Sequence, residues 1–238
     1  MQDRYAGDVG DYFKLSLLRD VGADRRLGIA WYVFPDEVHN SDGRHVSYIR
    51  EPERWRHLDP ELFDLLVAVI SKRRAVGELH RSLPGGTLFA SEPMPTGRMR
   101  GMDRCAARRA WFSRTLKSVE AADIVFADPD NGLTSDEGRR RLMPNFGKQI
   151  PISEVLALSA GRTAVVYHHN SRFKGGHESE VDYWLRAIGM PALAVRATAY
   201  SCRTFFVINP DAEIAERTRV FCDKWKDHKI RIHVSSTS

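Results

Sequence analysis

The chain has 238 residues, of which 42% are hydrophobic and 28% are charged, so its composition is that of a folded globular protein and excludes extensive disorder. No apolar run approaches the roughly 20 residues that span a bilayer, and the N-terminus lacks the apolar core of a signal peptide, so we expect no membrane contact and a cytoplasmic location. The three cysteines are far apart and form no C-x-x-C pair, which argues against a disulfide framework and a structural zinc site.

The predicted elements alternate between helices and strands. A helix over 11–21 precedes an apolar run over 27–34, which is typical of a strand buried on both faces. A polar loop over 36–45 follows, and Asp59 and Pro60 then begin a helix as its N-cap and first-turn proline. The later predicted elements are a strand over 87–91, a helix over 103–120, a strand over 124–127, a helix over 153–160, a strand over 163–167, a helix over 178–188, strands over 192–197 and 204–208, a helix over 210–225 and a strand over 230–234.

This alternation predicts an α/β fold with a mostly parallel sheet that is covered on both faces. The strands over 192–197 and 204–208 must be antiparallel, because a parallel crossover needs about a dozen residues. We therefore expect one Rossmann-like domain over residues 1–238, with a helical and loop insertion around 78–102. A parallel sheet that ends in an antiparallel hairpin resembles the plan of class I methyltransferases, and the strand over 124–127 should lie at its centre.

Polar segments follow three of the predicted strands, at 36–45, 128–132 and 168–172. The carboxyl ends of parallel strands meet at one edge of a sheet, and open α/β sheets bind their ligands there. We therefore expect these three segments to line one cleft.

The segment Asp128-Pro129-Asp130-Asn131-Gly132 has two interpretations. Each of its residue types favours a turn, and Asn-Gly accepts positive φ, so a plain turn explains it. Alternatively, a carboxylate and a proline carbonyl group at the end of a buried strand can accept hydrogen bonds from an exocyclic amine. Two acids two residues apart could instead hold Mg²⁺.

His168 and His169 follow the strand over 163–167, and their side chains should point to opposite faces of the sheet. One interpretation is a packed or solvent-facing histidine. The other is a general base or a phosphate contact, for which His168 is our candidate. The sequence contains no H-x-E or H-E-x-x-H pattern, and the leading interpretation includes no metal site.

The formal net charge is +5, and basic residues cluster over 98–117, where Asp103 is the single acid. Clustered Lys and Arg can neutralise phosphates and release counterions, so the cluster favours RNA or DNA as a partner. A solvated helix face explains it equally well. The candidate phosphate contacts are Arg104, Arg108, Arg172 and Lys174.

A resemblance to a known family rests on two motifs. Residues 5–14 read Y-A-G-D-V-G-D-Y-F-K, which is similar to the F-H-A-G-N-x-A-D-V-x-K-H opening of the RlmJ family of ribosomal RNA adenine-N6 methyltransferases. The catalytic strand of that family ends in D-P-P-Y, where this chain has D-P-D-N at 128–131, and residues 204–225 are also similar. The chain more closely resembles, over nearly its full length, a family of uncharacterised bacterial proteins with a D-P-D-N-G-L core. That second resemblance implies no function.

The methyltransferase resemblance implies methyl transfer from S-adenosylmethionine to nucleic acid or a nucleotide-like substrate. The catalytic candidates that it implies are Asp128, Pro129, Asp130, Asn131 and His168, with Tyr167 shaping the acceptor pocket. The implied cofactor-binding candidates are Tyr5, Gly7, Lys14, Asn40, Asp42 and Gly43. Residues 7–11 also fit a plain loop with Asp11 as a helix N-cap.

The chain departs from this family in two respects. The first strand is not followed by a G-x-G turn, where such enzymes hold the cofactor, and Asp130 and Asn131 replace the proline and aromatic residue that grip adenine. Two alternatives therefore stay open. One is a Mg²⁺-dependent nuclease or phosphohydrolase that uses Asp128, Asp130 and Asp42, and the other is a non-catalytic nucleic-acid-binding protein on a methyltransferase-like fold. The sequence predicts no oligomeric state.

Overall fold

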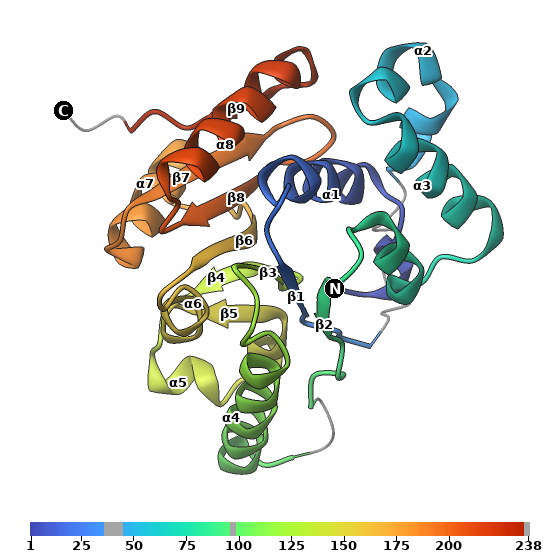
Figure 1. Ribbon diagram of the computed structural model, residues 1–238. Coiled ribbons are helices and arrows are strands. Elements are labelled where there is room, and N and C mark those ends of the chain that lie inside the picture. Colours follow the sequence, from blue (N-terminus) through green and yellow to red (C-terminus); the bar gives the residue numbers. More distant parts are fainter. Residues whose placement is uncertain (36–44, 96–98, 236–238) are drawn as a thin grey trace.

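A seven-stranded sheet forms the centre of the molecule, and helices cover both of its faces (Figure 1). The computed structural model describes residues 1–35, 45–95 and 99–235. The strands stand in the order β2-β1-β3-β6-β8-β7-β9. Their bounds are Leu27–Trp31 (β1), Leu88–Ala90 (β2), Ile124–Asp128 (β3), Thr163–His169 (β6), Ala192–Ala197 (β7), Arg203–Ile208 (β8) and Ile230–Ile232 (β9).

The neighbouring strands β2, β1, β3 and β6 are parallel to one another. β8 is antiparallel to β6, and β7 and β9 extend the sheet through antiparallel pairings. The predicted α/β fold with a mostly parallel sheet is therefore confirmed. β3 lies between β1 and β6, as its continuous apolar sequence predicts.

The longer helices form a layer on each face of the sheet. They are α1 (Val9–Val21), α3 (Pro60–Lys72), α4 (Gly101–Ser118), α6 (Ile152–Leu158), α7 (Gly176–Ile188) and α8 (Ala212–Lys224). α1, α3 and α8 share one hydrophobic core with Ile29 and Phe126 of the sheet. α4, α6 and α7 share a second core with Ala30 and Val125, because successive residues of a strand point to opposite faces.

Shorter elements complete the described chain. They are η1 (Asp3–Tyr5), η2 (Ser47–Arg50), α2 (Pro52–Trp55), η3 (Arg56–Leu58), η4 (Val76–Ser82), β4 (Gly132–Thr134), α5 (Gly138–Arg141), η5 (Pro144–Lys148), β5 (Gln149–Pro151) and η6 (Lys226–His228). β4 and β5 pair with each other in a small parallel sheet directly after the polar segment that ends β3. Residues 78–102, which we expected to form an insertion, contain β2, and β2 pairs with β1 as a strand of the main sheet.

Capping side chains set where two of these helices begin. Asp59 caps α3 by accepting a hydrogen bond from Leu62 N, and Pro60 occupies the first helical position, as predicted. α1 begins at Val9, earlier than predicted, because Asp8 accepts a hydrogen bond from Asp11 N and is the N-cap. Asp11 is therefore not the cap, and its carboxylate is available for another role.

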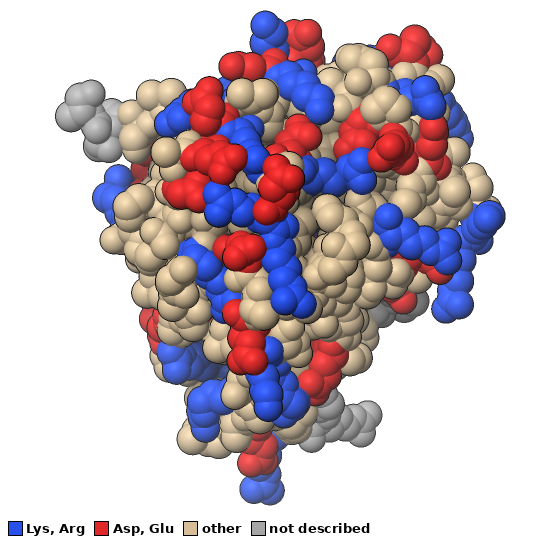
Figure 2. All heavy atoms as spheres, viewed as in Figure 1, with Lys and Arg blue, Asp and Glu red and all other residues tan. Residues whose placement is uncertain are grey.

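The surface carries both signs of charge. On the face shown in Figure 2, Lys and Arg side chains are intermixed with Asp and Glu side chains. In the part of the chain that the structure describes, none of the helices has the length and apolar character that a membrane span requires.

Candidate functional site

A cavity of about 330 Å³ lies where β3 and β6 end, beside the first turn of α1. Its volume is within the range of small-molecule sites. It is lined by Met1, Tyr5, Asp8, Gly10, Asp11, Lys14, His45, residues 128–131, Tyr167, His169, Ser201 and Arg203. The chain therefore brings the D-P-D-N segment together with Tyr5, Lys14 and Tyr167, which the sequence also selected.

Lys14 connects α1 to the end of β3 through two ion pairs. Its Nζ atom lies 2.6 Å from Asp11 Oδ1 and 2.6 Å from Asp128 Oδ2. Burial alone would lower the pKa of Lys14, but the attraction of the two carboxylates outweighs burial and raises it, so Lys14 remains an ammonium group. Burial raises the pKa of Asp11 to about 6, although Lys14 opposes this shift. The floor of the cavity is thus a buried carboxylate–ammonium–carboxylate bridge.

The side chain of Asp130 is held by the first two residues of the chain. Its Oδ1 lies 2.5 Å from the amino group of Met1, and its Oδ2 accepts a hydrogen bond of 2.6 Å from Gln2 Nε2. The Met1 amino group also donates to Tyr32 O at the end of β1. Asp130 therefore has a structural role in joining β1 to β3, whereas Asn131 beside it is exposed.

The turn after Asn131 has a conformation that requires glycine. Gly132 has φ +86°, and a Cβ atom on it would lie 2.5 Å from His168 Cα. The next residue, Leu133, donates its N–H to His168 Nδ1 at 3.0 Å. The turn interpretation therefore holds for the Asn131–Gly132 part of the segment, while Asp128 faces the cavity.

His168 lies outside the cavity, on the opposite face of β6 from the one we expected. It is buried, and its Nε2 lies 3.2 Å from Glu180 Oε1 of α7. Burial would raise the pKa of Glu180, but hydrogen bonds from His168, Ser171 and Asn170 outweigh burial and lower the pKa to about 2. His168 thus supports the turn after β3 from behind and cannot contact a ligand in the cavity.

Tyr167 and His169 are the β6 residues that line the cavity. They are two residues apart in a strand, so they point to the same face. The Tyr167 hydroxyl group lies 3.2 Å from His169 Nδ1. Burial raises the pKa of Tyr167, so this hydroxyl group stays protonated.

Gly7 and the loop after β1 hold the remaining cofactor candidates. Gly7 lies behind the cavity wall and donates its N–H to Asp11 Oδ2 at 2.7 Å. Its φ of +85° and the nearby side chain of Ile70 explain the glycine without any ligand. Asn40, Asp42 and Gly43 lie outside the described residues.

The basic candidates do not line the cavity. Arg108 is buried and makes a bidentate ion pair with Glu154, with Nε–Oε1 at 2.7 Å and Nη2–Oε2 at 2.9 Å. It also donates to two backbone carbonyl groups, so it cannot bind phosphate without breaking this cluster. Arg104 donates to the carbonyl groups of Leu142 and Met99. Arg172 and Lys174 are exposed.

Sequence reasoning missed several lining residues, above all Asp8, His45, Ser201 and Arg203. Arg203 begins β8 and stands opposite His169 in the ladder between β6 and β8. A late antiparallel strand beside β6 brings its first residues to the carboxyl end of β6. This pairing was predictable in type but not in register.

No protein-family model matches this chain, and no curated protein matches it. Among solved structures, the chain is similar to protein LPL1258 from Legionella pneumophila str. Philadelphia 1, of the DUF519 family, with a TM-score of 0.54 and 11% sequence identity. The match covers 98% of this chain and 99% of that chain. At this identity the similarity shows a shared fold over almost the whole length, and the name of that protein states no activity.

Proposed function

We propose that this protein is an S-adenosylmethionine-dependent methyltransferase that acts on nucleic acid or on a nucleotide-like substrate. The observation that carries the proposal is the position of the D-P-D-N segment at the carboxyl end of the central strand β3. There it lines one cavity with Tyr5, Lys14 and Tyr167. These are residues for which the family resemblance implies contact with cofactor or acceptor.

The sheet topology supports the proposal. A parallel sheet followed by an antiparallel pair at one side is the plan that the resemblance implies, and the order β2-β1-β3-β6-β8-β7 follows it. The strand order also reverses at β1 and β3, because the chain first adds β2 on one side and then β3 and β6 on the other. Open α/β sheets bind ligands next to such a reversal.

The chemistry of the lining fits an amine acceptor. Lys14 binds Oδ2 of Asp128, and within the described residues Oδ1 has no hydrogen-bond partner. Oδ1 and the carbonyl group of Pro129 can therefore accept hydrogen bonds from an exocyclic amine, while Tyr167 packs beside it. S-adenosylmethionine would supply the methyl group when bound. Methyl transfer to an amine depends chiefly on positioning, so no strong nucleophile is needed.

The fit to the cofactor is on the α1 side of the cavity. The carboxylates of Asp8 and Asp11 provide negative charge for a sulfonium or ammonium group there. The end of β1 offers no room for the cofactor, because Met1 is bound there. The amino group of Met1 donates a hydrogen bond to Tyr32 O, and the carbonyl group of Met1 accepts one from Phe34 N. Tyr5, Asp8 and Lys14 are therefore the residues that would hold the cofactor.

The Mg²⁺-dependent alternative receives less support from the arrangement of its carboxylates. Lys14 binds Asp128, and Met1 and Gln2 bind Asp130, so a divalent ion would have to displace cations and donors of the chain itself. Within the described residues, no group of three or more His, Cys, Asp or Glu side chains could hold a metal ion.

Calorimetry and a methyl-transfer assay test the proposal. Wild-type protein should bind S-adenosylmethionine and transfer its labelled methyl group to RNA, DNA or a nucleotide. Asp128→Asn should keep cofactor binding but lose at least about a hundredfold in turnover, the scale of a lost positioning contact. The matched control is Asp223→Asn, at an exposed residue of α8. Absence of S-adenosylmethionine binding by the wild-type protein would refute the proposal.

A further inference from the structure

Arg203 places a buried guanidinium group in the wall of the cavity. Only 4% of the residue is exposed. Its Nη2 donates to Ser201 Oγ, and its guanidinium carbon lies 5.8 Å from the centre of the Phe13 ring. Within residues 1–35, 45–95 and 99–235, Nε and Nη1 have no hydrogen-bond partner, and no carboxylate forms an ion pair with Arg203.

The other cations of the cavity are already paired with carboxylates. Lys14 lies between Asp11 and Asp128, and the amino group of Met1 contacts Asp130. A buried charge without a partner costs several kcal/mol of free energy, which is why buried charges in proteins are nearly always paired. The carboxylate of Asp8 is also near Arg203, because a Cβ atom on Gly10 would lie 3.0 Å from Asp8 Oδ1 and even closer to Arg203 Nη1. Within the described residues no hydrogen bond joins the two side chains, so Nε and Nη1 of Arg203 can still donate to a ligand.

The guanidinium group is held in place by its surroundings. It lies directly against the backbone of Gly10, where any Cβ atom would collide with Nη1. Gly10 is in the first turn of α1, where the carboxylate of the N-cap Asp8 already meets the positive end of the helix dipole. The charge of the Arg203 guanidinium group therefore favours a negatively charged group in the adjacent space.

We propose that Arg203 binds an oxyanion group, a carboxylate or a phosphate, of the molecule that occupies the cavity. This inference rests on the proposed function, which supplies two sources of the oxyanion group. They are the carboxylate of S-adenosylmethionine and a phosphate of the nucleotide substrate. The planar guanidinium fork matches both groups, since it can donate two parallel hydrogen bonds.

The positions of the strands define what kind of ligand can span the cavity. Asp128 ends β3 and Arg203 begins β8, and β6 lies between these strands. Strands are about 4.8 Å apart, so the two backbones are about 10 Å apart. Asp128 and Arg203 both line the cavity, so one ligand can place an amine at Asp128 and an oxyanion at Arg203.

Paired ligands that differ only in the oxyanion test this inference. Calorimetry compares AMP with adenosine, and S-adenosylmethionine with decarboxylated S-adenosylmethionine, which lacks only the carboxylate. Thermal shift tests inorganic phosphate. The variants are Arg203→Met and the matched control Arg219→Met, at an exposed residue of α8. We expect the wild-type protein and the control to prefer the oxyanion member of one pair by about 10- to 100-fold, and Arg203→Met to lose that preference.

The AMP pair identifies a phosphate and the S-adenosylmethionine pair a carboxylate, so the two arms separate the sources. Without ligand, Arg203→Met should melt no lower than the wild-type protein, because it removes an unpaired buried charge. If it fails to fold, Arg203→Lys keeps the charge without the fork and should weaken the same preference about tenfold.

Failure of this inference is distinguishable from failure of the proposed function. Equal affinity of wild-type protein and Arg203 variants for both members of both pairs, with no stabilisation by phosphate, would overturn the oxyanion site even if S-adenosylmethionine binds and is used. Conversely, an Arg203-dependent preference for AMP, without S-adenosylmethionine binding, would refute the methyltransferase and keep the oxyanion site.

Discussion

At the scale of single residues, the charge balance of the cavity depends on Lys14. Its ammonium group is shared by Asp11 and Asp128, both of which are buried. The cation between the two carboxylates offsets their mutual repulsion. The same residue therefore contributes to folding and holds the side chain of Asp128 in place at the cavity.

Replacement of Lys14 by Met should destabilise the protein strongly at pH 7. Removing one partner of a buried ion pair typically costs about 3–5 kcal/mol, because the remaining charges lose their compensation. Urea denaturation measures this change, and Lys117→Met, at an exposed position of α4, provides the control. A loss below about 1 kcal/mol would show that the bridge contributes little to stability.

The pH dependence of stability should report on Asp11. Its pKa is raised from 3.8 to about 6 by burial, so the folded state binds a proton more tightly than the unfolded state does. This contribution is fully present below pH 4 and is lost as the pH rises through 6. Relative to Asp11→Asn, the wild-type protein should lose roughly 2 kcal/mol of unfolding free energy between pH 4 and pH 7. If the unfolding free energies of the two proteins changed with pH in the same way, the raised pKa of Asp11 would be contradicted.

At the scale of elements, the strands around the cavity were predictable from the sequence. The face of the sheet to which the side chains at their ends point was not. β1, β3 and β6 are continuous apolar runs, which is typical of parallel strands covered on both faces. The choice between His168 and His169 depends on which face of β6 meets the cavity, and this parity requires knowledge of the sheet. Arg203 carried no signal, because an arginine just before an apolar strand normally indicates an exposed strand end.

The turn between β3 and β4 should be sensitive to any side chain at Gly132. Gly132→Ala places a Cβ atom against the backbone of His168 in addition to the cost of positive φ. We expect a loss of at least about 2 kcal/mol and weaker ligand binding, because the turn positions Asp128. Gly161→Ala is the control, since Gly161 has φ +71° but open space around it, and it should cost only about 1 kcal/mol. Equal losses in both variants would leave His168 without a supporting role.

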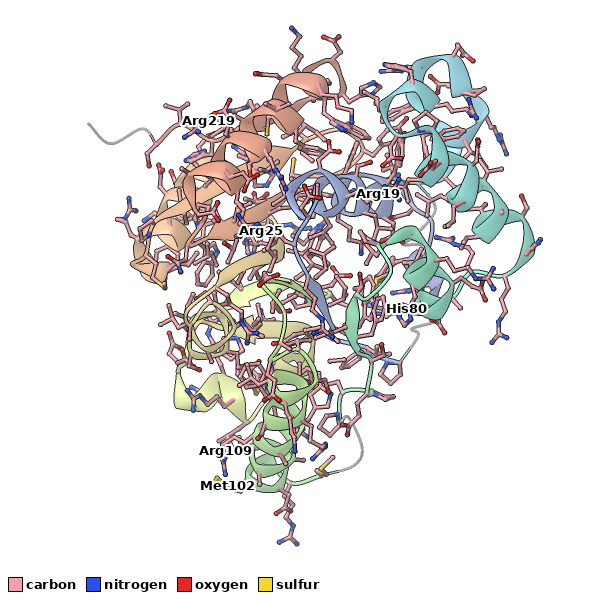
Figure 3. The ribbon with its side chains drawn as sticks, in the orientation of Figure 1. Arg19, Arg25, His80, Met102, Arg109 and Arg219 are labelled. Carbon is pink, nitrogen blue, oxygen red and sulfur yellow. The ribbon has the colours of Figure 1, made fainter. Side chains whose placement is uncertain are left out.

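At the scale of the whole molecule, the basic residues of α4 divide into two groups. Arg108 is part of the buried cluster with Glu154, and Arg114 makes a bidentate ion pair with Glu92. Arg109 is exposed on α4 (Figure 3). Lys117 on the same helix and Arg100, its N-cap residue, are exposed too. A variant that reverses Arg104, Arg108 and Arg109 together would therefore lose stability, because Arg108 is buried in its ion pair with Glu154.

Nucleic-acid binding should be tested with the exposed group alone. If Arg100, Arg109 and Lys117 contact phosphates, their combined change to Glu should weaken RNA or DNA binding and lower the salt slope by roughly 2 to 3, while the melting temperature stays constant. Filter binding between 50 and 200 mM salt provides the measurement. Affinity that ignores salt, or is unchanged in the variant, would show that this face of α4 is only solvated.

The division of the interior by the sheet also gives the protein a fluorescent probe in each helical layer. Trp31, Trp55 and Trp225 belong to the core beneath α1, α3 and α8, whereas Trp111 and Trp184 belong to the core beneath α4, α6 and α7. A double change of Trp111 and Trp184 to Phe would therefore leave emission from the first layer alone. Coincident unfolding curves for this variant, read by emission and by circular dichroism, would mean that the two layers come apart in a single cooperative event. A change in emission that precedes the change in circular dichroism would mean that α1, α3 and α8 detach while the strands of the sheet are still paired.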